Sequence, residues 1–471
     1  MPNIAYVAKS DETIAVVNVD TNVVLSTIPI GFVTNWIALT SDAKKAYLAN
    51  QFNNTINVLD LTSETIVAVI PLGSFNNQAN QPKQIFVHPN GLAYSANVSG
   101  TVSIIDTTSD TLITTVPVGQ GISDMELSPD GNYFYIVHDL AVSQFSTITN
   151  GVTNTILISN IAGDLTVSPD GQFVYVAIPG NIFFPNNLVV VVDIALSMQT
   201  ATVTVGNRPE KIDINSIGSR VYVANAGSGD VSVIDVPTNT VIATIPVGTT
   251  PNFQVITPDF GSQDYVARSG GITAINSTTF TPSPVVINAT PIRMVITPDG
   301  SKLIATAAST FLAIVNTQTN TLITEVELGA SSGFIALAPQ VSQTQELVYT
   351  TGIVMNLEDG LSLAQTVSVN VLNESYLRDV IVEVLAFAIP TLGSKTPIGH
   401  HLFLVPSDAA DMKAVDVSGV ANYEIQVKIS GLDLANVVLS IYGLNAMGNV
   451  ISDQIEQQGV LIAMPGLSFA P

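Results

Sequence analysis

The stretch VANAGSGDVSVIDVPTNTVIATIPVG (Val223–Gly248) contains the pattern on which most of the chain is built. It holds an apolar run, a turn of small polar residues, an alternating apolar run that ends in Asp235, and a third run that ends in Pro-Val-Gly. The same order occurs in YLANQFNNTINVLDLTSETIVAVIPLG from Tyr47 and in AYSANVSGTVSIIDTTSDTLITTVPVG from Ala93. The chain is therefore an internal repeat, and the repeat unit decides the fold.

The composition of the 471 residues indicates a β-rich protein without a membrane helix. Hydrophobic residues make up 46% of the chain, but they occur in short runs separated by Thr, Asn, Gly and Pro, which is typical of many short strands. The 37 acidic and 14 basic residues leave a net charge of −23, so nucleic acid is not an expected partner. The absence of cysteine excludes disulfides and thiol chemistry. The first residues do not resemble a conventional signal peptide, so export would follow trimming or use another route.

A turn motif related to Ser-Pro-Asp-Gly divides the repeats. Proline and the Asp-Gly pair suit a tight turn between two antiparallel strands, so turn chemistry is the interpretation preferred to calcium binding. The successive intervals are 48, 40, 40, 47, 42, 40 and 41 residues. They are counted between Ser41, Pro89, Pro129, Pro169, Ser216, Pro258, Pro298 and Pro339.

A unit of this length suits one four-stranded blade, and a closed ring of blades buries the faces that a single blade would expose. The sequence therefore predicts an all-β fold with a β-propeller at residues 1–341. Three strands near the N-terminus and one strand at 334–338 would complete a shared blade and close the ring. Counting inner strands gives eight blades, and seven is the alternative.

Two stretches carry a family resemblance: SPDGQFVYVA from Ser168, and VYVANAGSGDVSVIDVPTNTVIATIPVG from Val221. They resemble the YVTN-type β-propeller repeat of surface-layer and other extracytoplasmic proteins. The resemblance covers residues 1 to about 340. It implies a propeller, usually with seven blades, and an extracellular location on a cell or spore surface, but it implies no particular activity.

After the last repeat, residues 342–353 are predicted to be a linker or a closing segment. Strand-like alternation then continues, for example in TVSVNVLN from Thr366 and YEIQVKISG from Tyr423. This pattern predicts a small β-sandwich or jelly roll at residues 354–471.

The channel is the place where a propeller would carry chemistry. Each predicted inner strand offers one residue expected to face it: Trp36, Gln84, Asp124, Asp164, Lys211, Phe253, Arg293 and Phe334. Asp124 and Asp164 occupy neighbouring blades, where they could share a cation or raise one carboxyl pKa. Lys211 and Arg293 could neutralise them instead. These four charged residues form the candidate channel site, with salt-bridged channel residues as the structural alternative. No other catalytic, metal-binding or cofactor-binding motif is found, and no cofactor is predicted.

Two functions of different class follow. The preferred hypothesis is a non-catalytic cell- or spore-surface protein whose propeller binds a protein or surface-polymer partner and whose C-terminal domain mediates attachment or self-assembly. Its partner-binding loops would depart most from the repeat, at Phe75, Asn76, Phe183 and Phe184. The alternative is an enzyme similar to the propeller lactonases, acting at the central channel. A channel filled by the aromatic residues Trp36, Phe253 and Phe334 would argue against the enzyme.

Overall fold

A computed structural model divides the chain into two units, 1–341 and 342–471. The structure describes residues 3–180, 183, 185–257 and 262–338. It also describes, as backbone only, the strand segments between 345 and 463 whose bounds are given below.

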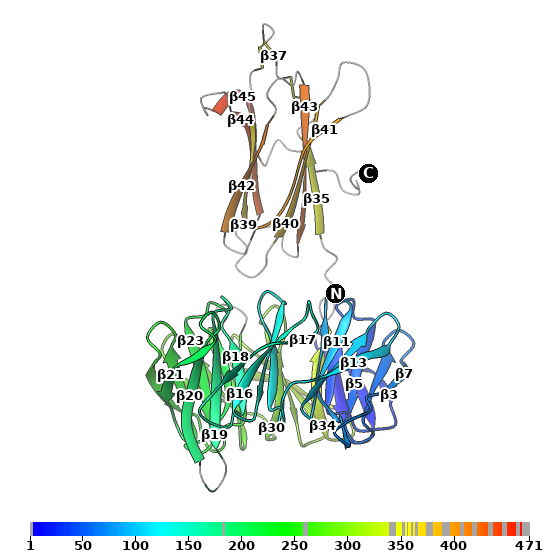
Figure 1. Ribbon diagram of the computed structural model, residues 1–471, viewed down its shortest axis with the longest axis vertical. Helices are drawn as coiled ribbons and strands as arrows, with labels where there is room; N and C mark the ends of the chain where they lie inside the picture. Colours follow the sequence, from blue (N-terminus) through cyan, green and yellow to red (C-terminus); the bar gives the residue numbers. More distant parts are fainter. Residues whose placement is uncertain are drawn as a thin grey trace. The chain divides into compact units, whose positions relative to one another are not determined.

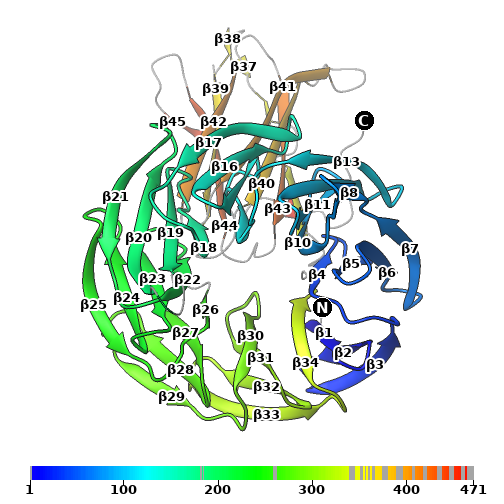
Figure 2. The same cartoon turned by 60° about the horizontal axis from the view of Figure 1, so that its bottom comes forward.

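The first unit is a ring of eight four-stranded antiparallel sheets (Figures 1 and 2), which we number as blades 1–8. Blade 1 combines β1 (Ile4–Lys9), β2 (Thr13–Asn18) and β3 (Val23–Pro29) with β34 (Ser332–Leu337). Blade 2 has β4 (Trp36–Leu39), β5 (Lys45–Asn50), β6 (Thr55–Asp60) and β7 (Thr65–Pro71). Blade 3 has β10 (Pro82–His88), β11 (Leu92–Asn97), β12 (Thr101–Asp106) and β13 (Thr111–Pro117). Blade 4 has β14 (Asp124–Leu127), β15 (Tyr133–His138), β16 (Ala141–Ser146) and β17 (Gly151–Leu157).

The other four blades follow the same order from the channel outward. Blade 5 has β18 (Asp164–Val167), β19 (Phe173–Gly180), β20 (Pro185–Asp193) and β21 (Met198–Thr204). Blade 6 has β22 (Pro209–Ile214), β23 (Arg220–Asn225), β24 (Asp230–Asp235) and β25 (Thr240–Pro246). Blade 7 has β26 (Phe253–Ile256), β27 (Gln263–Arg268), β28 (Gly271–Asn276) and β29 (Pro282–Val285). Blade 8 has β30 (Pro291–Ile296), β31 (Lys302–Ala307), β32 (Phe311–Asn316) and β33 (Thr321–Glu327).

This arrangement confirms the predicted eight blades, and the seven-blade alternative is wrong. The ring closes as the sequence predicts, because β1 pairs with β2 on one side and with β34 on the other. Lys9 reinforces the closure, since its Nζ donates to the carbonyl oxygen of Leu328 at 2.9 Å.

Apolar packing between blades supplies the core. The buried apolar side chains form eight clusters, one at each interface between neighbouring blades. At the closing interface, for example, Val7 and Val17 of blade 1 pack with Ile304 and Ile314 of blade 8. Burying apolar faces in this way is the main favourable contribution to folding, and the alternating runs of the repeat provide the two apolar faces of each blade.

A tyrosine near the start of the second strand adds a polar link to the next blade. The hydroxyls of Tyr47, Tyr94, Tyr175 and Tyr265 donate to the turn between the third and fourth strands of the following blade. Their acceptors are Asp110, Asn150, Asn239 and Asn320, each with φ between 51° and 55°. Asn and Asp tolerate this left-handed conformation better than most residues, so one side chain both permits the turn and binds the neighbouring blade.

The Ser-Pro-Asp-Gly motifs are turns, as predicted. The Ser128 hydroxyl donates to Asp130 at 2.6 Å and accepts from the Tyr133 N–H at 3.0 Å, while Gly131 has a φ of 72°. A non-glycine residue at this position would be strained.

The second unit has strands in several sheets. One has the order β41 (Thr396–Val405), β40 (Val380–Ala388), β43 (Asn422–Gly431), β35 (Gln345–Thr350) and β46 (Ile462–Ala463), with β36 (Val354–Met355) beside β43. Another has the order β42 (Ala409–Asp416), β39 (Thr366–Asn373), β44 (Val437–Leu444) and β45 (Val450–Gln457), and β37 (Leu357–Glu358) pairs with β38 (Leu361–Ser362). The segment 342–353, predicted as a linker or closing segment, thus contains β35, which pairs with β43.

We predict that Tyr94→Phe lowers the free energy of unfolding by about 1–2 kcal/mol. The Tyr94 side chain is fully buried, and its hydroxyl bonds Asn150 and the Thr147 carbonyl of the next blade. Urea denaturation measures the loss. Tyr133→Phe is the control, because the Tyr133 hydroxyl has no hydrogen-bond partner among the described residues; an equal effect of both variants would contradict the role of the inter-blade bond.

Candidate functional site

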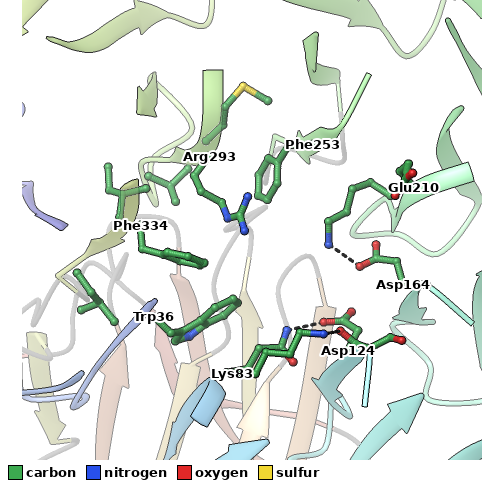
Figure 3. Close-up of a pocket in the computed structure, with 16 residues that line it drawn as sticks. Trp36, Lys83, Asp124, Asp164, Glu210, Phe253, Arg293 and Phe334 are labelled. Carbon is green, nitrogen blue, oxygen red and sulfur yellow. Dashed lines mark hydrogen bonds and ion pairs between the residues drawn. The ribbon is translucent and has the colours of Figure 1, made fainter. Parts of the chain in front are cut away.

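A pocket of about 530 Å³ opens at one mouth of the central channel. The inner strand of each blade contributes one of the residues that the sequence predicted to face the channel, and all eight of them line the pocket. These residues form two arcs (Figure 3). Blades 3–6 supply the polar arc, which consists of Gln84, Asp124, Asp164 and Lys211, and blades 7, 8, 1 and 2 supply Phe253, Arg293, Phe334 and Trp36.

Asp164 and Lys211 form an ion pair at the centre of the polar arc. Lys211 Nζ donates to Asp164 Oδ1, and the Ile212 N–H of the same strand as Lys211 donates to Asp164 Oδ2 at 2.9 Å. The Asp164 side chain is only 6% exposed, whereas that of Lys211 is 33% exposed. Lys211 therefore has the more exposed side chain of the two.

The surroundings move the pKa values of both partners. Burial, together with the charge of Asp124, raises the pKa of Asp164 to about 8, although Lys211 and the Ile212 N–H act in the opposite direction. Burial by itself lowers the pKa of Lys211, but Asp164 and Asp124 outweigh it, so that pKa lies above its ordinary value. The pair thus combines a lasting positive charge with a carboxyl group that titrates near neutral pH.

Asp124 is held by neighbours on both sides. Gln84 Nε2 donates to its Oδ1, and the Leu165 N–H lies 3.5 Å from its Oδ2. Beside it, Lys83 Nζ donates to the carbonyl oxygens of Ile122 and Ser123, at 3.0 and 2.6 Å. Burial lowers the pKa of Lys83. These contacts fix both side chains at the wall of the pocket.

Arg293 lies between two phenyl rings on the aromatic arc. Its Cζ is 5.3 Å from the ring centroid of Phe253 and 4.5 Å from that of Phe334. Phe334 in turn packs on Trp36, with ring centroids 5.1 Å apart. The aromatic residues leave the pocket open, so the channel mouth is not filled by them.

A second layer of carboxylates, which sequence reasoning missed, lies two residues further along the inner strands. Glu126 on β14 and Asp213 on β22 occupy this layer, and Asp213 Oδ1 accepts a hydrogen bond from the Ile214 N–H at 2.9 Å. Burial raises the pKa of Glu126 well above its ordinary value and that of Asp213 to about 6. The period-two alternation of the strands, which puts every second residue on the channel side, was the signal that could have identified them.

Two further lining residues come from β-bulges. Lys83 lies between Pro82 and Gln84 and has no partner residue on the second strand of its blade, because the register shifts there. Glu210 is in the same position between Pro209 and Lys211. A bulge re-aims side chains, so a constant spacing along the repeat could not place these two residues in the pocket.

Three of the four loop residues singled out in the sequence, Phe75, Asn76 and Phe183, do not line the pocket. Phe75 is half-buried at the end of β8 (Ser74–Phe75), which pairs with β9 (Gln78–Ala79), and Asn76 has a φ of 49° in the turn between them. Phe183 is 79% exposed, and Phe184 lies outside the described residues. Their role in binding a protein or surface polymer stays a prediction, as does the extracellular location.

Metal-binding clusters and membrane-spanning helices are both absent from the described residues. No three His, Asp or Glu side chains within the described ranges come close enough together to hold a metal ion. Asp124 and Asp164 each accept hydrogen bonds from the donors named above, and the suggestion from the sequence that they could share a cation stays a prediction. No helix in the described part of the chain is long and apolar enough to span a membrane.

Comparison with known proteins gives one family match. Residues 111–244 match the model of the family described as "Lactonase, 7-bladed beta-propeller". This segment runs from β13 to β25 and includes Asp124, Asp164 and Lys211. No curated protein sequence matches the chain.

Three solved structures are similar to the chain. The dihydro-heme d1 dehydrogenase NirN, solved in complex with DHE, has a TM-score of 0.59 at 14% identity, over 72% of this chain and 75% of NirN. The hydrazine synthase of Kuenenia stuttgartiensis has a TM-score of 0.46 at 18% identity, over 57% of this chain and 90% of its own. A functionally unknown protein from Desulfotomaculum acetoxidans has a TM-score of 0.48 at 17% identity, over 72% and 99%. At these identities the likeness to NirN shows the propeller fold.

These comparisons correct the preferred hypothesis from the sequence. The expectation of a non-catalytic cell- or spore-surface protein is wrong, because residues 111–244, which supply Asp124, Asp164 and Lys211 of the polar arc, match the model of an enzyme family. The absence of a recognisable catalytic motif misled the sequence-based hypothesis, since the pocket takes one residue from each blade and no short motif contains it. The lactonase alternative is the better supported interpretation.

Asp264 generates a prediction on stability. Both of its carboxylate oxygens are buried and have no hydrogen-bond partner among the described residues, and burial, followed by the charge of Asp213, raises its pKa well above the ordinary value. The unfolded chain releases this proton near pH 4, whereas the folded protein retains it, so stability falls as the pH rises above about 4.

We therefore predict that Asp264→Leu stabilises the protein by about 1–3 kcal/mol at pH 7. The electrostatic part of the gain should shrink as the pH falls toward about 4 and vanish below it, where Asp264 becomes neutral in the unfolded chain as well. The equivalent residue of blade 8, Leu303, is buried and apolar. Urea denaturation across this pH range tests the prediction, and Asp264→Asn separates the loss of charge from the change in shape. A gain independent of pH would contradict the electrostatic cause.

Proposed function

We propose that the chain is a lactonase-like propeller enzyme that hydrolyses a cyclic ester in the pocket at the channel mouth. The observation that carries the proposal is the Asp164–Lys211 pair, which lies in a pocket of substrate size and within the segment that matches the lactonase family model. A volume of about 530 Å³ falls within the range typical of small-molecule sites. The YVTN-type resemblance of the repeats stays an interpretation, and the proposal does not depend on it.

Hydrolysis of a lactone requires a base for water and a positive charge near the carbonyl oxygen. In the proposed reaction, ionised Asp164 accepts a proton from water as the water oxygen bonds to the lactone carbonyl carbon. The negative charge that develops on the carbonyl oxygen is stabilised by the ammonium group of Lys211. The bond from this carbon to the ring oxygen then breaks, and Asp164 returns its proton to the leaving oxygen. The product is a hydroxy acid.

The surroundings prepare both groups for these roles. A carboxylate with a pKa near 8 is a stronger base than an ordinary aspartate and is available close to neutral pH. The Ile212 N–H fixes its orientation from behind. Asp124 belongs to the same arc, and its negative charge disfavours ionisation of Asp164 and so raises the Asp164 pKa. Two neighbouring carboxylates commonly raise the pKa of one of them in this way.

The first test is a comparison of Asp164→Asn with the wild-type protein. Asparagine can still accept the Ile212 N–H but cannot take a proton, so we expect kcat for a hydrolysed sugar lactone to fall by about 10²–10⁴-fold. Proton release at constant pH measures the rate after subtraction of spontaneous hydrolysis. Asp170→Asn makes the same chemical change in the turn after the same inner strand, and it should retain activity. Equal activity of Asp164→Asn and wild type would overturn the proposal, as would the absence of lactone hydrolysis by the wild type.

The pH profile provides a separate test. Because ionised Asp164 is the base, kcat/KM should rise with pH through a midpoint near the Asp164 pKa of about 8 and level off at higher pH. Lys211 lowers the pKa of Asp164 by its charge and hydrogen bond, so Lys211→Met should move the midpoint of the residual activity to higher pH. A purely structural role of Lys211 would change the amount of active protein and leave the midpoint in place.

A further inference from the structure

Cations are concentrated in the pocket of a strongly acidic protein. The chain carries 37 acidic and 14 basic residues, yet the lining brings together Lys83, Lys211 and Arg293 with the carboxylates of Asp124 and Asp164, while Glu126 and Asp213 lie in the second layer. The remaining acid in the lining, Glu210, is paired with Arg208 at 2.8 Å. A protein with this net charge would not attract an anion to its surface in general, so a local concentration of cations singles out the pocket.

Arg293 has the most hydrogen-bonding capacity left of these three cations. Lys211 is paired with Asp164, and Lys83 is held by two backbone carbonyls. The Arg293 guanidinium makes one hydrogen bond within the described part of the chain, from Nη1 to the carbonyl oxygen of Ile292 at 2.9 Å. A guanidinium has five N–H donors, so most of its hydrogen-bonding capacity is available to a ligand.

The two phenyl rings decide how a ligand could approach. Phe253 and Phe334 stack near the guanidinium, and Figure 3 shows Arg293 extending between them toward the middle of the pocket. With these rings beside its faces, the N–H edge is the part left for recognition. This edge matches a carboxylate, which can accept two parallel hydrogen bonds. Burial lowers the pKa of Arg293, which means that the charge has lost hydration and would gain from an anionic partner.

The same arc offers an apolar surface for the rest of the ligand. Trp36 and Phe334 lie side by side next to Arg293, at a ring separation of 5.1 Å. A ligand with a flat, weakly polar body can pack on these rings while its anionic group meets the guanidinium. Asp164 lies on the other side of the pocket from Trp36 and Phe334 (Figure 3), and its partner Lys211 has its Nζ 5.8 Å from the ring centroid of Phe253.

We infer that Arg293 is a specificity-determining residue that binds a carboxylate of the pocket's ligand, an organic acid whose flat body packs on Trp36 and Phe334. Applied to the substrate, this inference rests on the proposed function and specifies a lactone that bears a free carboxylate group in addition to its cyclic ester. Binding of the carboxylate itself is independent of hydrolysis.

Trp36 makes the inference testable without activity, because it is the chain's only tryptophan and lines the pocket. The probes are benzoate, its neutral analogue benzamide, and phenyl phosphate, each titrated against the full-length protein while tryptophan fluorescence is recorded. We expect saturable binding of benzoate that is at least about tenfold tighter than that of benzamide, as a charge-assisted bidentate contact would give.

Arg293→Met should weaken benzoate binding by about 10–100-fold and leave benzamide binding nearly unchanged. Arg293→Lys should restore only part of the affinity, because a lysine cannot form two parallel bonds. The matched control is Arg220→Met, since Arg220 also packs on a phenylalanine ring, Phe280 at 4.8 Å, but does not line the pocket. Far-ultraviolet circular dichroism and urea denaturation verify that each variant is folded.

Three results would overturn the inference: equal affinity for benzoate and benzamide, unchanged benzoate binding in a folded Arg293→Met variant, or no response to benzoate. Much tighter binding of phenyl phosphate than of benzoate would overturn the assignment of a carboxylate. The outcome is distinguishable from that of the proposed function. Loss of benzoate binding in Arg293→Met without any lactone hydrolysis would support the anion site and reject the lactonase, whereas lactone hydrolysis by a wild-type protein that does not bind benzoate would do the reverse.

Discussion

The inner strand of every blade has a strand partner on one side only, and this constraint connects the fold to the pocket. Backbone N–H groups on the other side must bind something else, because an unpaired buried donor is costly. In blades 4 and 5 acidic side chains meet this need in the next blade: Asp124 approaches the Leu165 N–H, and Asp164 accepts a hydrogen bond from the Ile212 N–H. These two channel carboxylates are thus also links between blades.

This double role explains how a repeated framework could hold a reactive group. A carboxylate fixed by a backbone N–H is well oriented, but the same burial and the neighbouring acids make its charge unfavourable, so the pKa of Asp164 rises to about 8. Lys211 offsets part of this cost from one side. Across the pocket, stacking on Phe253 and Phe334 holds a third charge, on Arg293. Equivalent positions on the eight inner strands therefore form the polar arc on one side of the pocket and the aromatic arc on the other, according to the residue that each blade supplies.

Much of this architecture could be predicted from the sequence, and the parts that could not have physical reasons. The repeat period located the inner strands, which is why Asp124, Asp164, Lys211 and Arg293 could be assigned to one level of the channel. The bulges that bring Lys83 and Glu210 into the lining are insertions of a single residue. The length of the repeat itself varies by several residues, so the sequence does not reveal such insertions. The pairing of Asp164 with Lys211 depends on side-chain geometry between blades, which the sequence alone does not contain. The function was misjudged for a related reason, since residues far apart in the chain form the pocket.

The closure of the ring by β1 and β34 has a consequence for how the chain reaches this structure. Val7 pairs with Ile335, so the first blade lacks its innermost strand until nearly the whole propeller has been synthesised. During that time β1 presents an unpaired edge, which is a site for incorrect association. Long-range pairing of this kind also slows folding, because the entropy of closing a large loop must be overcome before the contact forms. The last strand to leave the ribosome in the propeller is thus the one that turns an open array of blades into a closed one, and the emerging chain would benefit from a chaperone that covers β1 until then.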